Sequence, residues 1–515
     1  MPTTPINQDD INKTVWSACD TFRGTVDPSI YKDFVLTMLF LKYISDVRQD
    51  KVEELTAQFG DNQAMIEAML ASQSFKIPTG STFWDLYEHR FEAGNGSRID
   101  QALHAIEEEN GTKLKGVFHD ITFNTDKLGD EKSKNDILRH LLEDFGKPTL
   151  NLRPSRVGSL DVIGNAYEFL IKHFAASSGK SAGEFYTPPE VSDLLSIILE
   201  PQQGDEICDP ACGSGSLLMK CGKQIQKNFG GSKQYALFGQ EAIGSTWSLA
   251  KMNMFLHGED NHRIEWGDTI RNPKLLDSSK QDGNGGLLHF DVVTANPPFS
   301  LDKWGHEDAE SDHFGRFRRG VPPKTKGDYA FISHMIETLK PASSSTKGGR
   351  MGVVVPHGVL FRASSEGKIR KQLIDENLLD TVIGLPEKLF FGTGIPAAIL
   401  LFKKHKTDNK VLFIDASREF KSGKNQNVLT SDNIQKIVDT YKTRQSVDKY
   451  AYLATLEEIA ENDYNLNIPR YVDTFEEEAE IDLMAVRSER LALQAELADL
   501  ELEMAGYLKE LGYGA

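Results

Sequence analysis

The feature that most constrains the fold is a pair of short apolar runs joined through a glycine-rich turn. The first run ends at Asp209, glycines follow, and an apolar helix pattern begins at Leu217. The second run, residues 235–240, ends at Glu241, 32 positions after Asp209. That separation leaves room for a helix and a loop, as two neighbouring parallel strands require. The sequence therefore predicts an α/β fold that contains a βαβ unit.

A further apolar run, Phe290 to Ala295, ends in the tetrad Asn-Pro-Pro-Phe. Its β-branched residues indicate a buried strand, which Pro297 and Pro298 cannot continue. We expect a stiff loop at the carboxyl edge of the sheet, where open α/β sheets bind ligands. Asn296 and the Pro297 carbonyl can accept hydrogen bonds from a planar amino group, and Phe299 offers a ring for stacking. A rigid turn without chemistry is the simpler alternative.

Other polar residues fall where such a sheet would hold a ligand. Glu241, at the end of the second strand, can accept both hydroxyl groups of a ribose. Thr187 is expected to be the N-cap of a helix at residues 190–199, with Pro189 in its first turn. Asp268 follows a short strand and is either a ligand contact or a surface acid.

Composition narrows the class of protein. The 515 residues carry a formal net charge of −18 at pH 7 and have a pI near 5.3, which argues against gripping nucleic acid over the whole surface. Four cysteines make no disulfide framework, and no histidine cluster accompanies Cys208, Cys212 and Cys221, so we expect no metal site. Without a signal peptide or an apolar run near the roughly 20 residues that span a bilayer, we expect a cytoplasmic protein with no membrane contact.

The two ends of the chain are separately organised. Residues 1–150 predict an all-α domain, whose most apolar helix is Ile30 to Val47. Further helices are expected at residues 51–58, 63–71, 99–109 and 132–142. We expect a catalytic domain at 151–420, a helical connector at 421–474 and one helix within 475–515. Apolar residues in that last helix step by 4, 3, 4, 3 and 4: Leu493, Leu497, Leu500, Met504, Tyr507 and Leu511. This heptad seam needs a partner helix, internal or from another subunit, and we favour another subunit.

Four motifs occur in order across residues 183–299: GEFYTPP, DPACGSG, GQE and NPPF. Together they resemble the motifs of the modification subunit of type I restriction-modification systems, which are N6-adenine DNA methyltransferases that use S-adenosyl-L-methionine. The resemblance implies a Rossmann-like methyltransferase sheet between the all-α amino-terminal domain and the helical, coiled-coil tail. It also implies site-specific transfer of a methyl group to an adenine that is flipped out of DNA.

The resemblance assigns roles to individual residues. The catalytic residues are Asn296, Pro297, Pro298 and Phe299. The cofactor-binding residues are Glu184, Phe185, Tyr186, Thr187, Pro188, Pro189, Asp209, Gly213, Ser214, Gly215, Ser216, Glu241 and Asp268. Asp268 would face the adenine amine of the cofactor. Strands at 379–385 and 397–402 would form the antiparallel edge of the sheet, and Phe390 or Phe391 is a candidate for the opposite wall of a base pocket.

In that family a specificity subunit reads the DNA sequence, often with two modification subunits, and a restriction subunit can join. The resemblance therefore implies that partners supply much of the grip on double-stranded DNA, which accounts for the acidic charge. We expect the carboxyl-terminal helix and the amino-terminal domain to contact the specificity subunit. Within this chain, a basic stretch with interleaved aromatic residues is the candidate for DNA contact, against a surface loop without that role. Its cations are Arg316, Arg318, Arg319, Lys324 and Lys326.

Three other functions remain open. A stand-alone adenine DNA methyltransferase would need its own sequence-reading region. A protein glutamine N5-methyltransferase uses a similar loop, but the long helical ends and the FYTP segment count against it. An inactive assembly scaffold is the non-enzyme alternative, and the intact Asp209, Glu241 and Asn296 count against that function.

Overall fold

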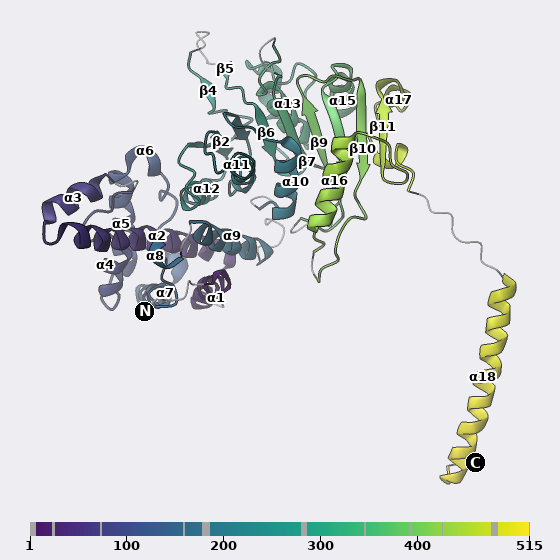
Figure 1. Ribbon diagram of the computed structural model, residues 1–515, viewed down its shortest axis with the longest axis horizontal. Coiled ribbons are helices and arrows are strands. Elements are labelled where there is room, and N and C mark those ends of the chain that lie inside the picture. The colour runs from purple at the N-terminus through teal and green to yellow at the C-terminus, as the bar shows by residue number, and fades with distance from the viewer. Residues whose placement is uncertain are drawn as a thin grey trace. The chain divides into compact units, whose positions relative to one another are not determined.

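The computed structural model describes residues 7–22, 26–72, 75–157, 160–177, 186–279, 286–343, 347–390, 394–424, 426–474 and 483–513. The chain divides into two compact units, residues 1–472 and 473–515 (Figure 1). Within the described ranges, no helix combines the length and the apolar character needed to cross a membrane.

The amino-terminal part of the larger unit is helical, as predicted. Its helices are α1 (Gln8–Ala18), α2 (Pro28–Phe59), α3 (Gln63–Ala71), α4 (Phe83–Glu88), α5 (Asn95–Glu109), α6 (Gly111–Leu114), α7 (Glu131–Phe145), α8 (Pro154–Val157) and α9 (Leu160–Ser177). The helices expected at 30–47 and 51–58 are one helix, α2, because no glycine or further proline interrupts it. Helix α3 has the predicted bounds.

A buried ion pair fastens the end of this helical region to α2. Lys42 and Asp46 lie one turn apart on α2 and form an ion pair that is shielded from solvent. The Lys42 ammonium also donates to the Leu150 carbonyl at 3.0 Å, and Asp46 accepts from the Leu152 amide at 2.9 Å. The segment that leads from α7 to α8 is therefore fixed against α2.

The described chain contains a nine-stranded mixed sheet. Its strands are β1 (Glu206–Asp209), β2 (Ala236–Glu241), β3 (His262–Trp266), β6 (Val292–Ala295), β7 (Arg350–Pro356), β8 (Leu379–Gly384), β9 (Ala397–Lys403), β10 (Lys410–Asp415) and β11 (Ala451–Thr455). They are arranged in the order β11-β10-β8-β9-β7-β6-β1-β2-β3. Strand β1 pairs in parallel with β2 and β6, so the predicted βαβ unit is confirmed. Strands β4 (Leu276–Asp277) and β5 (Gly286–Leu287) pair separately.

The predicted antiparallel pair is present but does not form an edge of the sheet. Strand β9 lies between β7 and β8 and runs antiparallel to both. Strand β10 then pairs with β8, and β11 pairs with β10, so the sheet extends two strands further. The expectation of a helical connector at 421–474 is therefore wrong, because this segment supplies the edge strand β11. It also contains α16 (Ser431–Thr443), α17 (Leu456–Glu461) and a short 3-10 helix, η5 (Ile468–Arg470).

Helices cover both faces of the sheet (Figure 1). One face carries α10 (Pro189–Leu199), α11 (Ser216–Asn228), α12 (Gly244–Leu256) and α16, and the other carries α13 (Asp328–Glu337) and α15 (Ser365–Asp375). Short helices α14 (Gly358–Phe361) and η4 (His306–Ser311) lie in the connections. Successive strand residues alternate between the two cores, as Ile207 and Cys208 do.

Helix α12 is the junction between the amino-terminal helices and the sheet. Every residue from Thr246 to Leu256 is buried. The helix contacts strands β2 and β3 as well as helices α2 and α9. The amino-terminal helices and one face of the sheet therefore share a continuous hydrophobic core.

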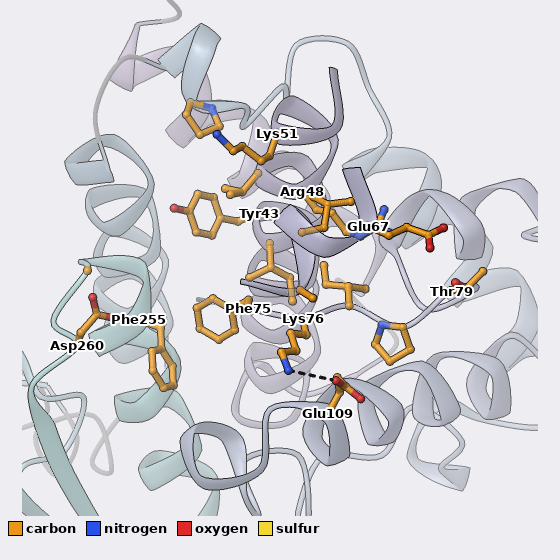
Figure 2. Close-up of a pocket in the computed structure, with 18 residues that line it drawn as sticks. Tyr43, Arg48, Lys51, Glu67, Phe75, Lys76, Thr79, Glu109, Phe255 and Asp260 are labelled. Atoms are coloured by element: carbon orange, nitrogen blue, oxygen red, sulfur yellow. Dashed lines mark ion pairs between the residues drawn. The ribbon is translucent and has the colours of Figure 1, made fainter. Parts of the chain in front are cut away.

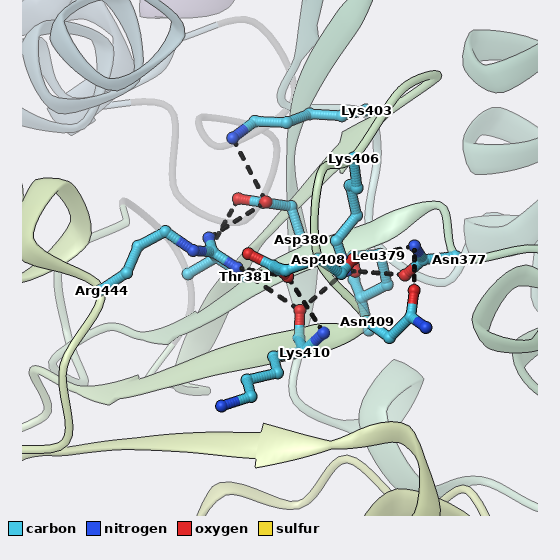
Figure 3. Close-up of polar contacts among 10 residues, drawn as sticks. All are labelled: Asn377, Leu379, Asp380, Thr381, Lys403, Lys406, Asp408, Asn409, Lys410 and Arg444. Atoms are coloured by element: carbon cyan, nitrogen blue, oxygen red, sulfur yellow. Dashed lines mark hydrogen bonds and ion pairs between the residues drawn. The ribbon is translucent and has the colours of Figure 1, made fainter.

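At the amino-terminal end of β8, a buried acid ties together segments that are distant in the sequence (Figure 3). Asp380 accepts a hydrogen bond from the Thr381 hydroxyl at 2.9 Å and one from Arg444 at 3.0 Å. It also forms an ion pair with Lys403 at 3.2 Å. Since Lys403 ends β9 and Arg444 follows α16, this carboxylate connects three elements.

A second cation, Lys406, binds main-chain and side-chain oxygens in the same region. The Lys406 ammonium donates to the carbonyls of Leu379 and Lys410 at 2.7 and 2.8 Å and to the side-chain oxygen of Asn377 at 2.9 Å (Figure 3). Burial lowers the pKa of Lys406 to about 8, although nearby acids oppose this shift. All three donors of this ammonium thus have a neutral acceptor.

The smaller unit contains the helix α18 (Leu483–Glu510), and none of its described residues is buried. The expected helix was to begin near 475, and residues 475–482 lie outside the described residues. All members of the predicted heptad seam are exposed: Leu493, Leu497, Leu500, Met504, Tyr507 and Leu511.

Candidate active site

The turn between β1 and α11 brings main-chain groups to the carboxyl edge of the sheet. Gly213 and Gly215 have φ angles of +53° and +79°, a left-handed region that suits glycine. A Cβ atom on Gly215 would lie 2.6 Å from the methyl carbon of Met254, so the loop approaches α12 closely. In α12, the Asn253 amide group donates to the Ser214 carbonyl at 2.9 Å. The loop is therefore held in one shape where it enters the first turn of α11, whose amides are open to a ligand.

Asp209, the last residue of β1, has a carboxylate oxygen without a donor. The residue is 1% exposed, and its Oδ1 accepts from the Ala211 amide at 2.9 Å. Its Oδ2 is buried and has no hydrogen-bond partner among the described residues. Burial raises the pKa of Asp209 to about 8, and the charge of Glu241 adds to this rise. Because an unpaired buried acceptor is unfavourable, the site favours a ligand that brings a donor or a positive charge.

Glu241, at the end of β2, connects the second strand to the loop after the first. Its Oε2 accepts from the Gly213 amide at 3.0 Å, and its Oε1 accepts from the Ile243 amide at 2.9 Å. Burial raises the pKa of Glu241, while these backbone hydrogen bonds oppose the rise. Each carboxylate oxygen can accept a second hydrogen bond. Acceptance of two ribose hydroxyls therefore stays a prediction that this geometry permits.

Asn296 follows directly after β6, on the strand next to the one that ends in Asp209. Its Nδ2 donates to the Thr187 hydroxyl oxygen at 3.3 Å. Its Oδ1 is buried and has no partner among the described residues. The expectation that Thr187 caps α10 is wrong. The helix begins at Pro189, so its N-cap is Pro188, and Thr187 lies one residue before the cap. The Thr187 hydroxyl lies beside the Asn296 amide instead.

The remaining residues of the cofactor prediction are placed as follows. Glu184 and Phe185 lie outside the described residues. Tyr186 is buried, and Ser216 is the first residue of α11. Asp268 follows β3, and its Oδ1 accepts from the amides of Ile270 and Arg271 at 2.8 and 3.0 Å. This oxygen shapes a turn, so contact of Asp268 with a cofactor stays a prediction.

The aromatic ring of the tetrad, that of Phe299, packs against a phenylalanine in the segment between β8 and β9. The ring centroids of Phe299 and Phe390 are 5.9 Å apart in an edge-to-face arrangement. Such a contact fixes the plane of a ring. Phe391, the other candidate for the opposite wall, lies outside the described residues.

A buried acid holds the chain where it leaves the tetrad. Ser300 has a φ angle of +53°, which is unusual for a residue other than glycine. Its amide donates to Asp328 Oδ1 at 2.8 Å. Asp328 is 2% exposed, and its other oxygen binds Arg362 at 2.5 Å. Arg362 is fixed in turn by Glu366.

Sequence reasoning missed both Asp328 and Asn253. Each lies at least 28 positions from its partner, so no local pattern reveals the contact. A signal for Asn253 was available, because the side-chain NH2 of an asparagine in the apolar run of α12 needs an acceptor when that helix is buried.

Two residues of the basic stretch are turned into the protein. Arg316 is buried and binds Asp312 at 2.8 Å. Arg319 is 2% exposed, donates twice to Glu376 at 2.7 and 2.6 Å, and donates once to Glu337 at 2.7 Å. These bonds contradict the prediction of DNA contact for Arg316 and Arg319, because their guanidinium groups are used inside the fold.

The other three cations of the stretch remain candidates for DNA contact. Arg318 and Lys324 are exposed, and Lys326 is half-buried. Arg318 pairs with Glu337 at 3.2 Å, but its own side chain is 54% exposed, so its guanidinium can also reach a phosphate.

A cavity of about 590 Å³ lies away from these residues, between α2, α3 and the end of α12 (Figure 2). Phe75 and Phe255 meet in its wall with ring centroids 5.1 Å apart, and Lys76 pairs with Glu109 at 3.6 Å. The tetrad and the glycine-rich loop do not line this cavity. Among the described residues, no group of histidine, cysteine and acidic side chains is arranged to hold a metal ion.

Comparison with known proteins shows to which family the chain belongs. Residues 158–480 match the model of the N-6 DNA Methylase family, and residues 11–145 match that of the HsdM N-terminal domain. The chain is 32% identical over 510 residues to the methylase subunit of type I restriction enzyme MpnII of Mycoplasma pneumoniae, covering 92% of this chain and 91% of that protein. It is 32% identical over 471 residues to the HindI methylase subunit of Haemophilus influenzae, covering 88% and 98%.

A solved structure agrees with these relatives. The methyltransferase subunit of a type I restriction-modification system from Streptococcus thermophilus superimposes with a TM-score of 0.78 at 36% identity, covering 91% of this chain and 100% of that chain. The predicted fold class, a methyltransferase sheet with an all-α amino-terminal region and a carboxyl-terminal helix, is confirmed. The chain belongs to the N-6 DNA methylase family, among the methylase (modification) subunits of type I restriction enzymes.

Proposed function

We propose that this chain transfers a methyl group from S-adenosyl-L-methionine to N6 of an adenine in double-stranded DNA, at sites selected by a partner specificity subunit. The observation that carries the proposal is the buried Oδ1 of Asn296, which has no donor among the described residues. An exocyclic amino group would supply that donor. The ring of Phe299, three residues along the chain, would stack on the base that carries it.

The edge formed by β1 and β2 suits the cofactor. The unpaired Oδ2 of Asp209 would accept from a positively charged group of S-adenosyl-L-methionine, and Glu241 would accept the ribose hydroxyls. Gly213 and Gly215 let the main chain approach the ligand closely. Further contacts are assigned to Tyr186, Thr187, Pro188, Pro189, Ser214, Ser216 and Asp268. When bound, the cofactor supplies a methyl group activated by a sulfonium centre.

The target adenine must leave the duplex to reach this edge, at a cost of a few kcal/mol. Asn296 Oδ1 and the Pro297 carbonyl would then accept the two N6 hydrogens. Because the Nδ2 of Asn296 donates to Thr187, its Oδ1 is the atom left for the substrate. Pro298 keeps the loop stiff, and Phe299 holds the plane of the base.

These groups would act by positioning and by electrostatics. As nitrogen N6 forms its bond to the methyl carbon, the bond between that carbon and the sulfonium sulfur would break, and the remaining thioether would leave. Nitrogen N6 becomes positive in this step and would afterwards lose a proton to solvent water. Two oxygens fixed beside N6 stabilise that developing charge without having to reorganise. Asp328, through Ser300, keeps the loop in the required conformation.

Partners would supply what this chain lacks. With a net charge of −18, the chain repels DNA except at local cations such as Arg318, Lys324 and Lys326. We assign α18 and the amino-terminal helices to contact with a specificity subunit. The complex would hold a second copy of this chain and, in its nuclease form, a restriction subunit. We place the reaction in the cytoplasm.

The test uses the complex purified with its specificity subunit and measures tritium transfer to DNA. We expect Asn296→Ala to lower the transfer rate by about a thousandfold or more, since an oriented acceptor is lost, while the Kd for the cofactor stays within about threefold. Asn228→Ala, at an exposed asparagine of α11, is the control and should transfer at the wild-type rate. Transfer by Asn296→Ala near that rate would refute the proposal.

The same assay separates the alternatives. Label in protein rather than DNA would indicate a glutamine methyltransferase. Site-specific label without the specificity subunit would indicate a stand-alone DNA methyltransferase. Failure of the chain to bind the cofactor in calorimetry would indicate a scaffold.

A further inference from the structure

A short loop with two lysines follows β10 at the same edge of the sheet as the tetrad. Strands β7 and β8 both run antiparallel to β9, and they pair in parallel with β6 and β10, respectively. Strands β6 and β10 therefore point the same way, so the residues that follow them lie at one edge. Lys421 and Val428 pair through main-chain hydrogen bonds of 2.9 and 3.1 Å, which closes the loop at its base. We name residues 421–424 and 426–428 the basic loop.

Hydrogen bonds fasten the basic loop beside the aromatic side of the candidate active site. Three amide donors of Gln426 and Asn427 bind the main-chain carbonyls of residues 387–389 at distances from 2.9 to 3.1 Å. The next residue along the chain is Phe390, whose ring centroid lies 5.9 Å from that of Phe299 in the tetrad. The basic loop is therefore joined to the tetrad through one short segment.

The main chain of the basic loop is held in one shape. A Cβ atom on Gly423 would overlap the carbonyl oxygen of Gln426, so the turn at this point needs a glycine. Asn427 is 7% exposed, and its hydrogen bonds are therefore shielded from water. The main-chain positions of Lys421 and Lys424, on either side of Gly423, are set before a partner binds. Such preorganisation lowers the entropy that is lost on binding.

The basic loop differs in charge from the chain that carries it. The chain has a net charge of −18, whereas residues 420–431 contain two lysines and no acid. Lys421 and Lys424 are both exposed, and neither side chain has a hydrogen-bond or ionic partner among the described residues. Glu419, the acid that precedes this stretch, pairs with Lys436 instead. The two ammonium groups are therefore available to an anion that comes from outside the chain.

We infer that the basic loop binds the DNA backbone next to the adenine that enters the candidate active site. A flipped base stays attached to its strand, so the phosphates on either side of it remain near the pocket. Phe299 and Phe390 would hold the base, and the basic loop is bound to the residues immediately before Phe390. An exposed lysine binds a phosphate as a point charge, without reading the sequence. The inference rests on the proposed methylation of DNA and specifies where this chain holds the strand.

The first test measures how duplex DNA binds the complex of this chain with its specificity subunit, by fluorescence anisotropy at several salt concentrations. The duplex carries the site that the complex methylates. In the double variant Lys421→Gln and Lys424→Gln, we expect the Kd to rise about tenfold near physiological salt, because two phosphate contacts are lost. The slope of log Kd against log salt should fall by about 1–2 for the same reason. The Kd for the cofactor should not change.

Two matched variants show whether position or net charge is responsible. Lys227→Gln with Lys410→Gln removes the same charge from exposed lysines at the opposite edge of the sheet, near the end of α11 and at the start of β10. We expect its Kd for DNA to stay within about twofold of the wild type, since salt screens distant charges. Lys421→Arg with Lys424→Arg keeps both charges and should bind like the wild type. Equal Kd values and equal salt slopes in the two glutamine variants would overturn the inference.

Substituted DNA shows which phosphates the basic loop contacts. A methylphosphonate linkage removes the charge of a single phosphate. Placed on either side of the target adenine, it should weaken binding to the wild-type complex and add little to the loss in the variant Lys421→Gln and Lys424→Gln, because the contact is already gone. Placed at the ends of the duplex, it should affect both complexes equally. Fully additive losses beside the target adenine would contradict the contact.

Methyl transfer and co-purification separate this inference from the proposed function. A wild-type complex that methylates DNA, with a glutamine variant of the basic loop that binds DNA equally well, would overturn the inference alone. A wild-type complex that does not methylate DNA would overturn the proposed function, and the inference with it. The specificity subunit should co-purify with the glutamine variant as it does with the wild type. Its loss from that variant would make the basic loop a protein contact and would overturn the assignment to DNA.

Discussion

The two edges of the catalytic sheet differ in whether the protein itself supplies hydrogen-bond donors to their buried oxygens. At the carboxyl edge, Asp209 Oδ2 and Asn296 Oδ1 are buried without a donor among the described residues. At the amino-terminal end of β8, Asp380 is just as buried, 2% exposed against 1% for Asp209, but it has three donors (Figure 3). Those donors are Thr381, Lys403 and Arg444. The described residues supply donors to the acid at the second edge, whereas they leave these two oxygens at the first edge available to a ligand.

This difference separates a structural acid from a binding acid. A buried charge with partners connects the segments that supply them, and removing it leaves those partners unpaired. A buried acceptor without a partner lowers the stability of the free protein. A ligand that supplies a donor removes this unfavourable term, which adds to the affinity for that ligand. Substitutions at the two edges should therefore affect different measurements.

The largest effect is expected for Asp380→Ala. Loss of this carboxylate leaves Lys403 and Arg444 without their shared anion, so the free energy of unfolding should fall by about 3–4 kcal/mol. Urea denaturation of the full chain measures this change. Asp408→Ala, at a half-buried acid 3.4 Å from Arg444, is the control and should cost under about 1 kcal/mol. If Asp380→Ala also transferred methyl groups more slowly per folded molecule than the wild type, the distinction between a structural edge and a binding edge would be contradicted.

Asp209→Asn should give the reverse pattern. The cofactor Kd should weaken by about 10- to 100-fold, or about 1.4–2.7 kcal/mol, because the side chain can no longer release its proton and bind the positively charged group of the cofactor as a carboxylate. The free energy of unfolding at pH 7 should not fall, because the buried carboxyl no longer opposes folding. Calorimetry and urea denaturation measure the two quantities. A destabilised variant with normal affinity would assign Asp209 to the structure instead.

The pH dependence of stability should have opposite slopes for the two edges. The pKa of Asp209 is raised from 3.8 to about 8, so between these values the folded chain holds a proton that the unfolded chain has released. Stability should therefore fall as pH rises through this range, by up to about 1.4 kcal/mol per pH unit. The pKa of Lys406 is lowered from 10.5 to about 8, so between pH 8 and 10.5 the unfolded chain holds the extra proton and stability should rise.

Urea denaturation across pH separates these contributions when each variant is subtracted from the wild type. Asp209→Asn should remove the falling slope, and Lys406→Met should remove the rising one. A falling slope that persists in Asp209→Asn would mean that another group, such as Glu241, carries it.

The smallest effect is expected for Lys406→Met near pH 7. Methionine keeps the apolar stem, and the three oxygens that lose their donor include two main-chain carbonyls at the start of neighbouring strands. Removing a partly buried ammonium offsets much of this loss. We expect a change in the free energy of unfolding of about 1 kcal/mol or less, measured by urea denaturation. A loss of unfolding free energy as large as that of Asp380→Ala would show that Lys406 stabilises this end of the sheet as much as Asp380 does.

Local patterns predicted the elements that local sequence determines. Helix α3 begins and ends at the expected residues, and β1 and β2 end at Asp209 and Glu241 as the turn after each strand requires. The position of β9 between β7 and β8, and the pairing of β11 with β10, depend on contacts between distant segments. A single apolar run does not specify its neighbour in a sheet.

The candidate site shows the same division. The sequence placed Asp209 and Asn296 each at the end of an apolar strand, and the structure pairs these two strands, β1 and β6, in parallel. The prediction of DNA contact for Arg319 was wrong because Arg319 binds Glu376, 57 positions away in the sequence. The charge of a residue alone does not reveal such a distant partner. Likewise, the Thr187 hydroxyl meets Asn296 109 positions along the chain, which no capping pattern could indicate.

Helix α12 has no side turned to solvent, and this limits how the protein can be divided. Its Asn253 holds the glycine-rich loop after β1, and Phe255, two residues further, packs against Phe75 of the amino-terminal region. The glycine-rich loop and the amino-terminal helices thus both pack on this helix. A catalytic fragment cut away from those helices would present the apolar outer side of α12 to water. We therefore expect a catalytic fragment without its amino-terminal region to be less stable than the full chain.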